Sequence, residues 1–243
     1  MIRRTLAQTK VELRLTLRRG ESVLLTFAIP ILLLGFFSAV DVLPKPDGVK
    51  DAVDFLLPGI LALAVMSTAM VSLAIATGFE RDTGVLKRLG VTPLRRSELL
   101  AAKTLTILII EVVQVAVLFG EGVAIGWRPH GALPWLAVGA MLLATVAFAG
   151  LGLLLAGTLP ALTTLAAANG LWLVLLLVSG MVFPIDRLPG GMQAVAKALP
   201  SGALAQGLDH ALGYGPGSGK PLLVLAAWAV ISPVVAAICF RWE

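Results

Sequence analysis

The feature that most constrains this chain is the stretch from Leu133 to Ile185, which contains no charged residue. A second stretch, from Val53 to Phe79, contains one charged residue, Asp54. Soluble domains carry about a quarter of charged residues, spread along the chain, whereas this chain carries 14%. A surface that faces water cannot be built from such stretches, so they predict segments whose solvent is lipid.

Both stretches are apolar at successive positions, whereas transmembrane β-strands need apolar and polar residues in alternation. A helix satisfies its backbone hydrogen bonds within one segment, which makes it the structure expected inside a bilayer. We therefore predict an all-α polytopic membrane protein with about six transmembrane helices. The expected spans are roughly 22–43, 55–78, 104–127, 133–158, 161–183 and 221–241.

The first twenty residues are basic and amphipathic. Residues 1–20 hold six Lys and Arg residues, and apolar side chains between them fall on one helical face. This pattern predicts a helix that lies in the membrane interface. A signal peptide would need a shorter basic region followed by a cleavage site of small residues, and that reading is rejected. The apolar face consists of Ile2, Leu6, Leu13 and Leu17.

The distribution of Lys and Arg predicts the orientation of the chain. With the N-terminus inside the cell, the cytoplasmic segments carry thirteen of the 19 basic residues and the outer segments carry six. This bias favours a multi-pass protein of the cell membrane with both termini in the cytoplasm. It also accounts for the net charge of +5, so nucleic acid is not expected as a partner.

The charged segment 80–103 reads as two short helices joined by a turn. Thr92 is expected to cap the second helix at its N-terminus, with Pro93 at the first helical position. From composition alone, an ordinary basic cytoplasmic loop would be favoured. The apolar side of the first helix consists of Val85, Leu86 and Leu89, and its basic residues are Arg81, Lys87 and Arg88.

The order of residues in this segment adds information. Glu-Arg-x-x-Gly, then Leu, then Thr-Pro and finally Lys resembles the signature of the type-2 ATP-binding-cassette (ABC) exporter permeases. Val85 departs from the Thr that is frequent in that family, and Ala102 departs from its Gly. The matching residues are Glu80, Arg81, Gly84, Leu86, Leu89, Thr92, Pro93 and Lys103.

A second resemblance lies after the fifth expected span. Here the chain has a Ser-Gly, a Phe-Pro and two Leu-Pro pairs, a series similar to one in the same family. Together with the six spans and the N-terminal helix, the resemblance covers essentially the whole chain, and drug-resistance permeases such as anthracycline exporters look most similar. The pairs begin at Ser179, Phe183, Leu188 and Leu199.

The resemblance implies one transmembrane permease domain over residues 1–243 of an ABC exporter. Two permease subunits, identical or related, would form the pathway, and two separate ABC ATP-binding subunits would hold ATP and magnesium, so this chain would carry no cofactor. Residues 80–103 would be the cytoplasmic coupling segment, and residues 184–220 would form short re-entrant helices on the outer face. The substrate would be apolar or amphipathic, such as a drug, a lipid or a lipid-linked molecule. The residues expected to dock the ATPase and transmit its movement are Glu80, Arg81, Asp82, Gly84, Val85, Leu86, Lys87, Arg88, Leu89, Thr92, Pro93 and Arg95.

Other chemistries find little support in the sequence. The stretch from Tyr214 to Pro221 resembles a phosphate-binding loop but has Tyr and Pro where that loop needs Gly and Ser or Thr. His130 and His210 lie far apart without a metalloprotease pattern, and the single Cys239 excludes a disulfide within the chain. Neither a catalytic site nor a metal site is expected, and the chain is read as a transport subunit rather than an enzyme.

The third expected span carries three polar residues, Glu111, Gln114 and Glu121, on a stripe of about 80°. Such residues usually face the protein interior or a watery path. One interpretation is a polar lining of the transport route. The other is that Glu121 lies at the outer interface and Glu111 pairs with a base such as Lys103. An ion-coupled secondary transporter with Glu111 as proton carrier is the alternative function, although we find no inverted repeat.

Overall fold

The computed structural model describes residues 2–40, 52–128, 133–181, 185, 188–214 and 219–240. Every regular element in these ranges is helical, so the prediction of an all-α protein is confirmed. Parts of the chain considered above lie outside the described residues: His130, the pair Phe183 and Pro184, residues 215–218, and the counted basic residues Lys45, Lys50, Arg187 and Arg241. The elements are α1 (Ile2–Arg18), α2 (Gly20–Ala39), α3 (Ala52–Met66), the π-helix η1 (Ser67–Ser72), α4 (Leu73–Asp82), α5 (Val85–Gly90), α6 (Arg96–Ile125), α7 (Pro134–Thr158), α8 (Ala161–Val178), α9 (Gly190–Ala198), α10 (Pro200–Ala211) and α11 (Lys220–Cys239).

The membrane-spanning helices agree with the predicted polytopic fold. Five stretches are long and apolar enough to cross a membrane, and α1 with α2 makes a sixth if this pair, bent by 69°, counts as one span. The second span is longer than predicted and runs from Ala52 to Asp82. The third begins at Arg96 rather than near residue 104. The five stretches are Ala52–Asp82, Arg96–Ile125, Pro134–Thr158, Ala161–Val178 and Lys220–Cys239.

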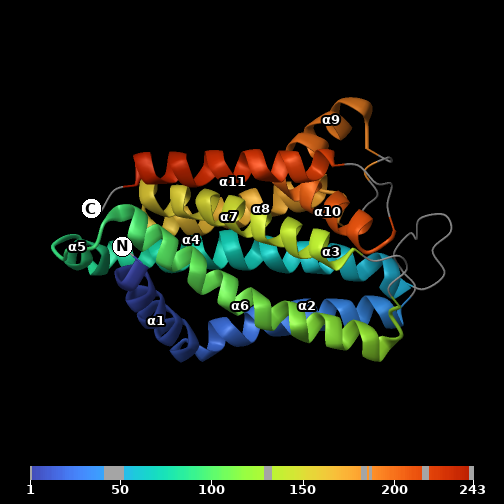
Figure 1. Ribbon diagram of the computed structural model, residues 1–243, viewed down its shortest axis with the longest axis horizontal. Helices are drawn as coiled ribbons and strands as arrows, with labels where there is room; N and C mark the ends of the chain where they lie inside the picture. The colour runs from blue at the N-terminus through green and yellow to red at the C-terminus, as the bar shows by residue number, and fades with distance from the viewer. Residues whose placement is uncertain are drawn as a thin grey trace.

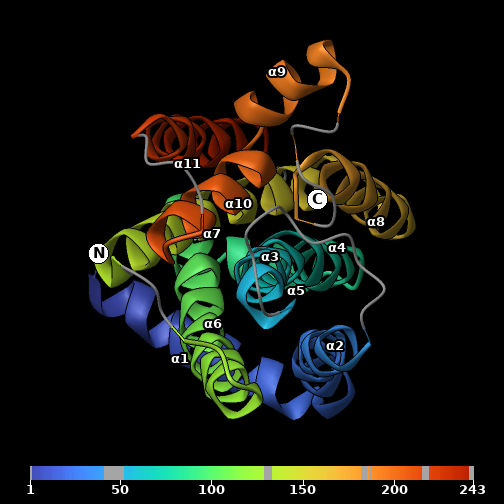
Figure 2. The ribbon, with the colours of Figure 1, turned by 90° about the vertical axis from the view of Figure 1, so that its right-hand side faces the viewer.

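The long helices lie roughly side by side, with α7 in the middle (Figures 1 and 2). Helix α7 packs against α11, α4 and α10, whereas α2 packs mainly on α3 and α6. Figure 1 places α5, the start of α1 and the end of α11 at one end of the bundle, which we call the inner end. Helices α9 and α10, which fall in the predicted outer-face region, lie toward the other end.

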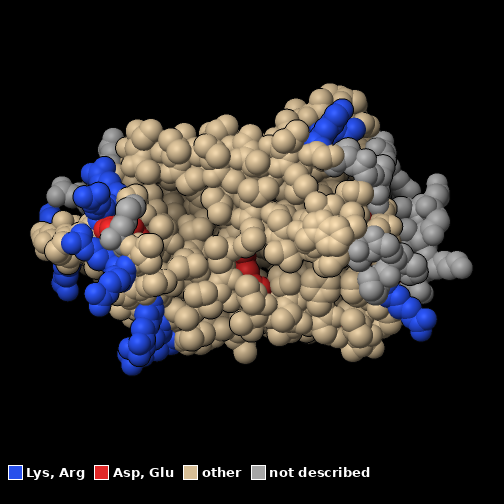
Figure 3. Space-filling model, in the orientation of Figure 1, with Lys and Arg blue, Asp and Glu red and all other residues tan. Residues whose placement is uncertain are grey.

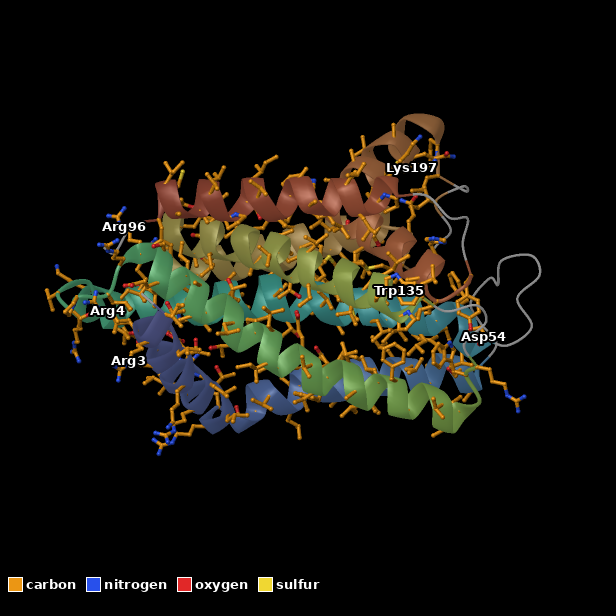
Figure 4. The ribbon with its side chains drawn as sticks, in the orientation of Figure 1. Arg3, Arg4, Asp54, Arg96, Trp135 and Lys197 are labelled. Carbon is orange, nitrogen blue, oxygen red and sulfur yellow. The ribbon has the colours of Figure 1, made fainter. Side chains whose placement is uncertain are left out.

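Charge separates the two ends from the middle. On the face drawn in Figure 3, Lys and Arg gather mainly at the inner end, and the middle is almost free of them. Figure 4 places Arg3, Arg4 and Arg96 at the inner end and Asp54 and Lys197 toward the other. A belt without basic residues between two polar ends is the surface that a bilayer requires.

Helix α1 is amphipathic in the sense expected for an interfacial helix. Of the four residues of the expected apolar face, Ile2, Leu6 and Leu17 are exposed and Leu13 is half-buried, whereas Thr9 and Glu12 are buried. The buried side packs on α6, where the Thr9 hydroxyl lies 3.4 Å from the Ala102 carbonyl oxygen. The apolar side is therefore left for lipid.

The second span contains a π-helical segment, η1, that the pattern of residues did not predict. Helix α7 approaches this segment closely, because a Cβ on Gly152 would lie 2.6 Å from the Met70 carbonyl oxygen. Glycine permits this contact between backbones. Short π segments inside α-helices occur frequently at functional sites.

Close packing of α7 on α11 leads to a first prediction. A Cβ on Gly150 would lie 2.6 Å from the backbone nitrogen of Pro233, whereas one on Gly139 would meet nothing within 4 Å. We expect Gly150→Ala to destabilise the protein by roughly 1–3 kcal/mol through overpacking. Thermal melting in mild detergent measures the effect. The control, Gly139→Ala on the same helix, should melt at or above the wild-type temperature, and equal losses from both variants would contradict the packing argument.

Candidate coupling site

Four charged residues from three segments meet near the inner end and form what we call the inner charge cluster: Glu12, Arg19, Glu80 and Lys103. The Lys103 ammonium lies 3.0 Å from Glu12 Oε2 and 2.5 Å from Glu80 Oε2. The Arg19 guanidinium approaches Glu80 Oε1 at 3.4 Å. The cluster therefore joins α1, the end of α4 and the start of α6.

Lys103 is the centre of the cluster and is only 2% exposed. Burying an ammonium is costly unless opposite charges surround it, and here two carboxylates do. The suggestion that Lys103 pairs with Glu111 is wrong. Eight residues separate them on one helix, a rise of about 12 Å, which their side chains do not bridge.

The turn between α4 and α5 depends on Gly84, whose φ of 74° places it in the left-handed region. Helix α5 then runs from Val85 to Gly90 and carries most of the first expected short helix, whereas Arg81 lies on α4, before the turn. Leu86 is fully buried and holds α5 on the bundle, and Leu89 is half-buried. The expected apolar anchor is thus formed by Leu86 and Leu89, while Val85 is 38% exposed.

Glu80 and Arg81, the first two residues of the signature, do not project freely from the inner end. Glu80 is buried in the cluster. Arg81 donates from Nη2 to the Leu159 carbonyl oxygen at 2.7 Å and so ties the end of α4 to the turn between α7 and α8. The exposed charged residues of the segment are Asp82, Lys87, Arg88, Arg95 and Arg96.

The predicted cap by Thr92 is wrong. Helix α6 begins at Arg96, and the Arg95 backbone nitrogen donates to Glu98 Oε2 at 2.9 Å. Thr92 instead donates to the Leu89 carbonyl oxygen at 2.6 Å and closes the end of α5. The Pro93 carbonyl accepts from Arg4 Nη1 at 2.9 Å, so this turn is bound to α1.

The second short helix of the prediction is therefore the beginning of α6. Leu99 and Leu100, in its first turns, are buried. Helix α6 is continuous from Arg96 to Ile125, so the turn after α5 leads directly into a membrane span. Sequence reasoning treated these two parts as separate elements.

The exposed side of α5 and its following turn form a surface that we call the docking tip: Val85, Lys87, Arg88 and Val91. Val91 is 87% exposed, the largest exposure of the large hydrophobic residues described. The sequence analysis did not single out Val91. The signal that could have found it is an apolar residue in a polar turn, between Gly90 and Thr92. An exposed apolar residue among basic residues is suited to contact another protein.

Two of the three polar residues on the stripe of α6 face the protein interior. Glu111 is buried and is hydrogen-bonded to the Thr145 hydroxyl of α7. Gln114 is also buried; it accepts from Thr68 at 3.1 Å and donates to the Thr26 carbonyl oxygen at 2.8 Å. Glu121 is half-buried, beside Gly35. These contacts connect α6 to α7, η1 and α2.

At the end opposite the docking tip, Tyr214 joins three segments. Its hydroxyl lies 3.0 Å from Asp54 Oδ1 and 2.9 Å from the Arg128 carbonyl oxygen. Burial raises the pKa of Tyr214, and the bond to Asp54 and the negative charge of that carboxylate raise it further. The phenol therefore stays protonated at neutral pH and can donate in this position.

Two comparisons with known proteins bear on this arrangement. The sequence profile of the family described as "ABC-2 type transporter" matches residues 3–212 of the chain. The chain is also 27% identical over 229 residues to YvfS of Bacillus subtilis (strain 168), which carries the name of a transport permease. That alignment covers 92% of this chain and 91% of YvfS.

Proposed function

Because the chain belongs to the ABC-2 type transporter family, we propose that it is the permease subunit of an ABC exporter. It moves an apolar or amphipathic substrate out of the cell, with ATP hydrolysed by a separate subunit. A drug, a lipid or a lipid-linked molecule fits the nearly uncharged spans. The proposed setting is the cell membrane, with the inner end and both termini in the cytoplasm.

The observation that carries this proposal is the geometry of the inner end. An exposed apolar residue, Val91, lies in the turn that joins the short helix α5 to the span α6. The same segment is tied to α1 through Arg4 and to the turn between α7 and α8 through Arg81. A protein that moves the docking tip therefore moves several spans at once.

The proposed assembly contains two permease subunits, identical or related, and two ABC ATP-binding subunits that hold ATP and magnesium. Each ATP-binding subunit contacts one docking tip, and its closure around ATP pushes α5. The buried Glu80, Leu86 and Lys103 transmit this movement, while Asp82, Val85, Lys87, Arg88 and Arg95 lie where the partner arrives. Drug resistance is the physiological role that we propose for such export.

The test is reconstitution with the cognate ATP-binding subunit. The two proteins are co-purified, placed in proteoliposomes, and given a fluorescent amphipathic dye as the transport probe. We expect dye movement that requires both proteins and hydrolysable ATP, in the direction from the α5 side to the α9 side. Stable binding without ATP-dependent movement of any amphipathic probe would contradict the proposal.

The same vesicles separate this function from ion-coupled transport. The Thr145 hydroxyl has one proton to donate but two possible acceptors. It lies within hydrogen-bond distance of the Glu111 carboxyl group and 2.8 Å from the Met141 carbonyl oxygen. A side chain at position 111 that donates to Thr145 satisfies both contacts, and a glutamine amide can do so. We therefore expect Glu111→Gln to keep at least half of ATP-driven export, with Glu111→Leu as the control that loses the bond. Abolished export in Glu111→Gln, with movement driven by a pH gradient alone in the wild type, would favour a proton carrier.

A further inference from the structure

A groove of about 640 Å³ opens between α2, the second span, α6 and α8. Its volume falls within the range of about 300–1,000 Å³ that is usual for small-ligand sites. Most of its wall is apolar, and it includes side chains from all four helices. Representative lining residues are Ile29, Leu33, Val71, Ile107 and Trp172.

One end of the groove is polar, because all four members of the inner charge cluster line it. Helix α2 has 20 residues, which corresponds to a length of about 30 Å, the thickness of the hydrocarbon core of a bilayer. Arg19 immediately precedes this helix and therefore lies at the level of the lipid headgroups. The apolar part of the groove then extends along the hydrocarbon.

The two basic residues at the polar end differ in how many acidic partners they have. Lys103 is held between Glu12 and Glu80, and Glu12 also accepts from Gln8 at 2.9 Å. The Arg19 side chain is 46% exposed, and within the described ranges its guanidinium contacts only Glu80, at 3.4 Å. A guanidinium has five N–H donors, so this residue, which lines the groove, has donors to offer a ligand beyond its contact with Glu80. The ligand chemistry that matches is an anionic oxygen group on an apolar tail.

We propose that this groove binds an anionic phospholipid, with its phosphate at Arg19 and an acyl chain along α2 and the second span. The proposal depends on the proposed function only for placing Arg19 at the cytoplasmic leaflet. Arginine pairs well with phosphate oxygens. An acyl chain in the groove exchanges contacts with other lipids for contacts with the apolar wall, and every phospholipid has such chains. The headgroup contact therefore decides which lipid is retained.

The test is native mass spectrometry of the purified full chain in neutral detergent, titrated with phosphatidylglycerol or phosphatidylcholine. We expect phosphatidylglycerol to be retained preferentially, and Arg19→Gln to reduce its retention roughly tenfold, the loss expected for a charge-assisted bond. Arg14→Gln removes the same charge from an exposed position on α1 outside the groove and should leave retention unchanged. Ala76→Phe fills the groove and should reduce retention of both lipids.

Several results would overturn the proposal. Equal losses from Arg14→Gln and Arg19→Gln would indicate diffuse attraction to a basic surface. Equal retention of both lipids would indicate a purely apolar ligand, and a dimer that Ala76→Phe dissociates would indicate that a second copy fills the groove. The melting temperature of each variant is measured as well, so that a loss of binding caused by misfolding is recognised. Because neither ATP nor the ATP-binding subunit is present, failure here leaves the exporter proposal intact, and failed transport leaves the lipid result intact.

Discussion

Replacing Lys103 by methionine is expected to lower the free energy of unfolding by about 3–5 kcal/mol, the usual loss when one partner of a buried ion pair is removed. The reason is that Glu12 and Glu80 would remain buried without the ammonium that lies within 3.0 Å of both. Methionine keeps nearly the length of the side chain, so packing changes little. Unfolding in mixed detergent micelles, followed by tryptophan fluorescence, measures the difference.

The control for this prediction removes the whole charge group. In the variant Glu12→Gln, Glu80→Gln, Lys103→Met, no buried charge is left unpaired, and we expect most of the lost stability to return. Arg19→Gln should cost no more than about 1 kcal/mol, since the Arg19 side chain is 46% exposed and Glu80 keeps its bond to Lys103. If Lys103→Met is as stable as the wild type, the cluster does not hold α1, α4 and α6 together.

The spans could be predicted from the sequence because their signal is local. The run from Leu133 to Ile185 lacks charges at every position, and its meaning does not depend on what it touches. The amphipathic pattern of residues 1–20 is local in the same way. Helix ends were less accurate, because the start of α6 depends on Glu98 and on the contact of Pro93 with the distant Arg4.

The inner charge cluster could not be predicted because its members are 91 and 23 residues apart along the chain. One signal was available: Glu12 is the single acidic residue among the first twenty residues, and an isolated acid in a basic helix suggests a buried base elsewhere. Its partner could not be chosen, since several Lys and Arg residues were within plausible reach. The π segment in the second span had no recognisable pattern either.

The structure also changes which residues should test docking. Charge reversal at Arg81 would break its bond to the Leu159 carbonyl oxygen, so a loss of export would report on folding as much as on the partner. Val91 and Arg88 are exposed on the docking tip, and surface substitutions of this kind usually change stability by less than about 0.5 kcal/mol. They therefore separate docking from folding.

We expect Val91→Asp, alone and with Arg88→Glu, to weaken binding of the ATP-binding subunit about 30-fold or more, as for the loss of an interface hot spot. Export should then fall below detection, because an undocked ATPase cannot push α5. Binding is measured by titrating the ATP-binding subunit onto permease in nanodiscs, and export with the reconstituted vesicles. The matched control is Val195→Asp, an exposed valine on α9 away from the docking tip, which should bind and export normally. Wild-type affinity in the double variant would show that the ATP-binding subunit docks elsewhere, and the coupling role of α5 would have to be abandoned.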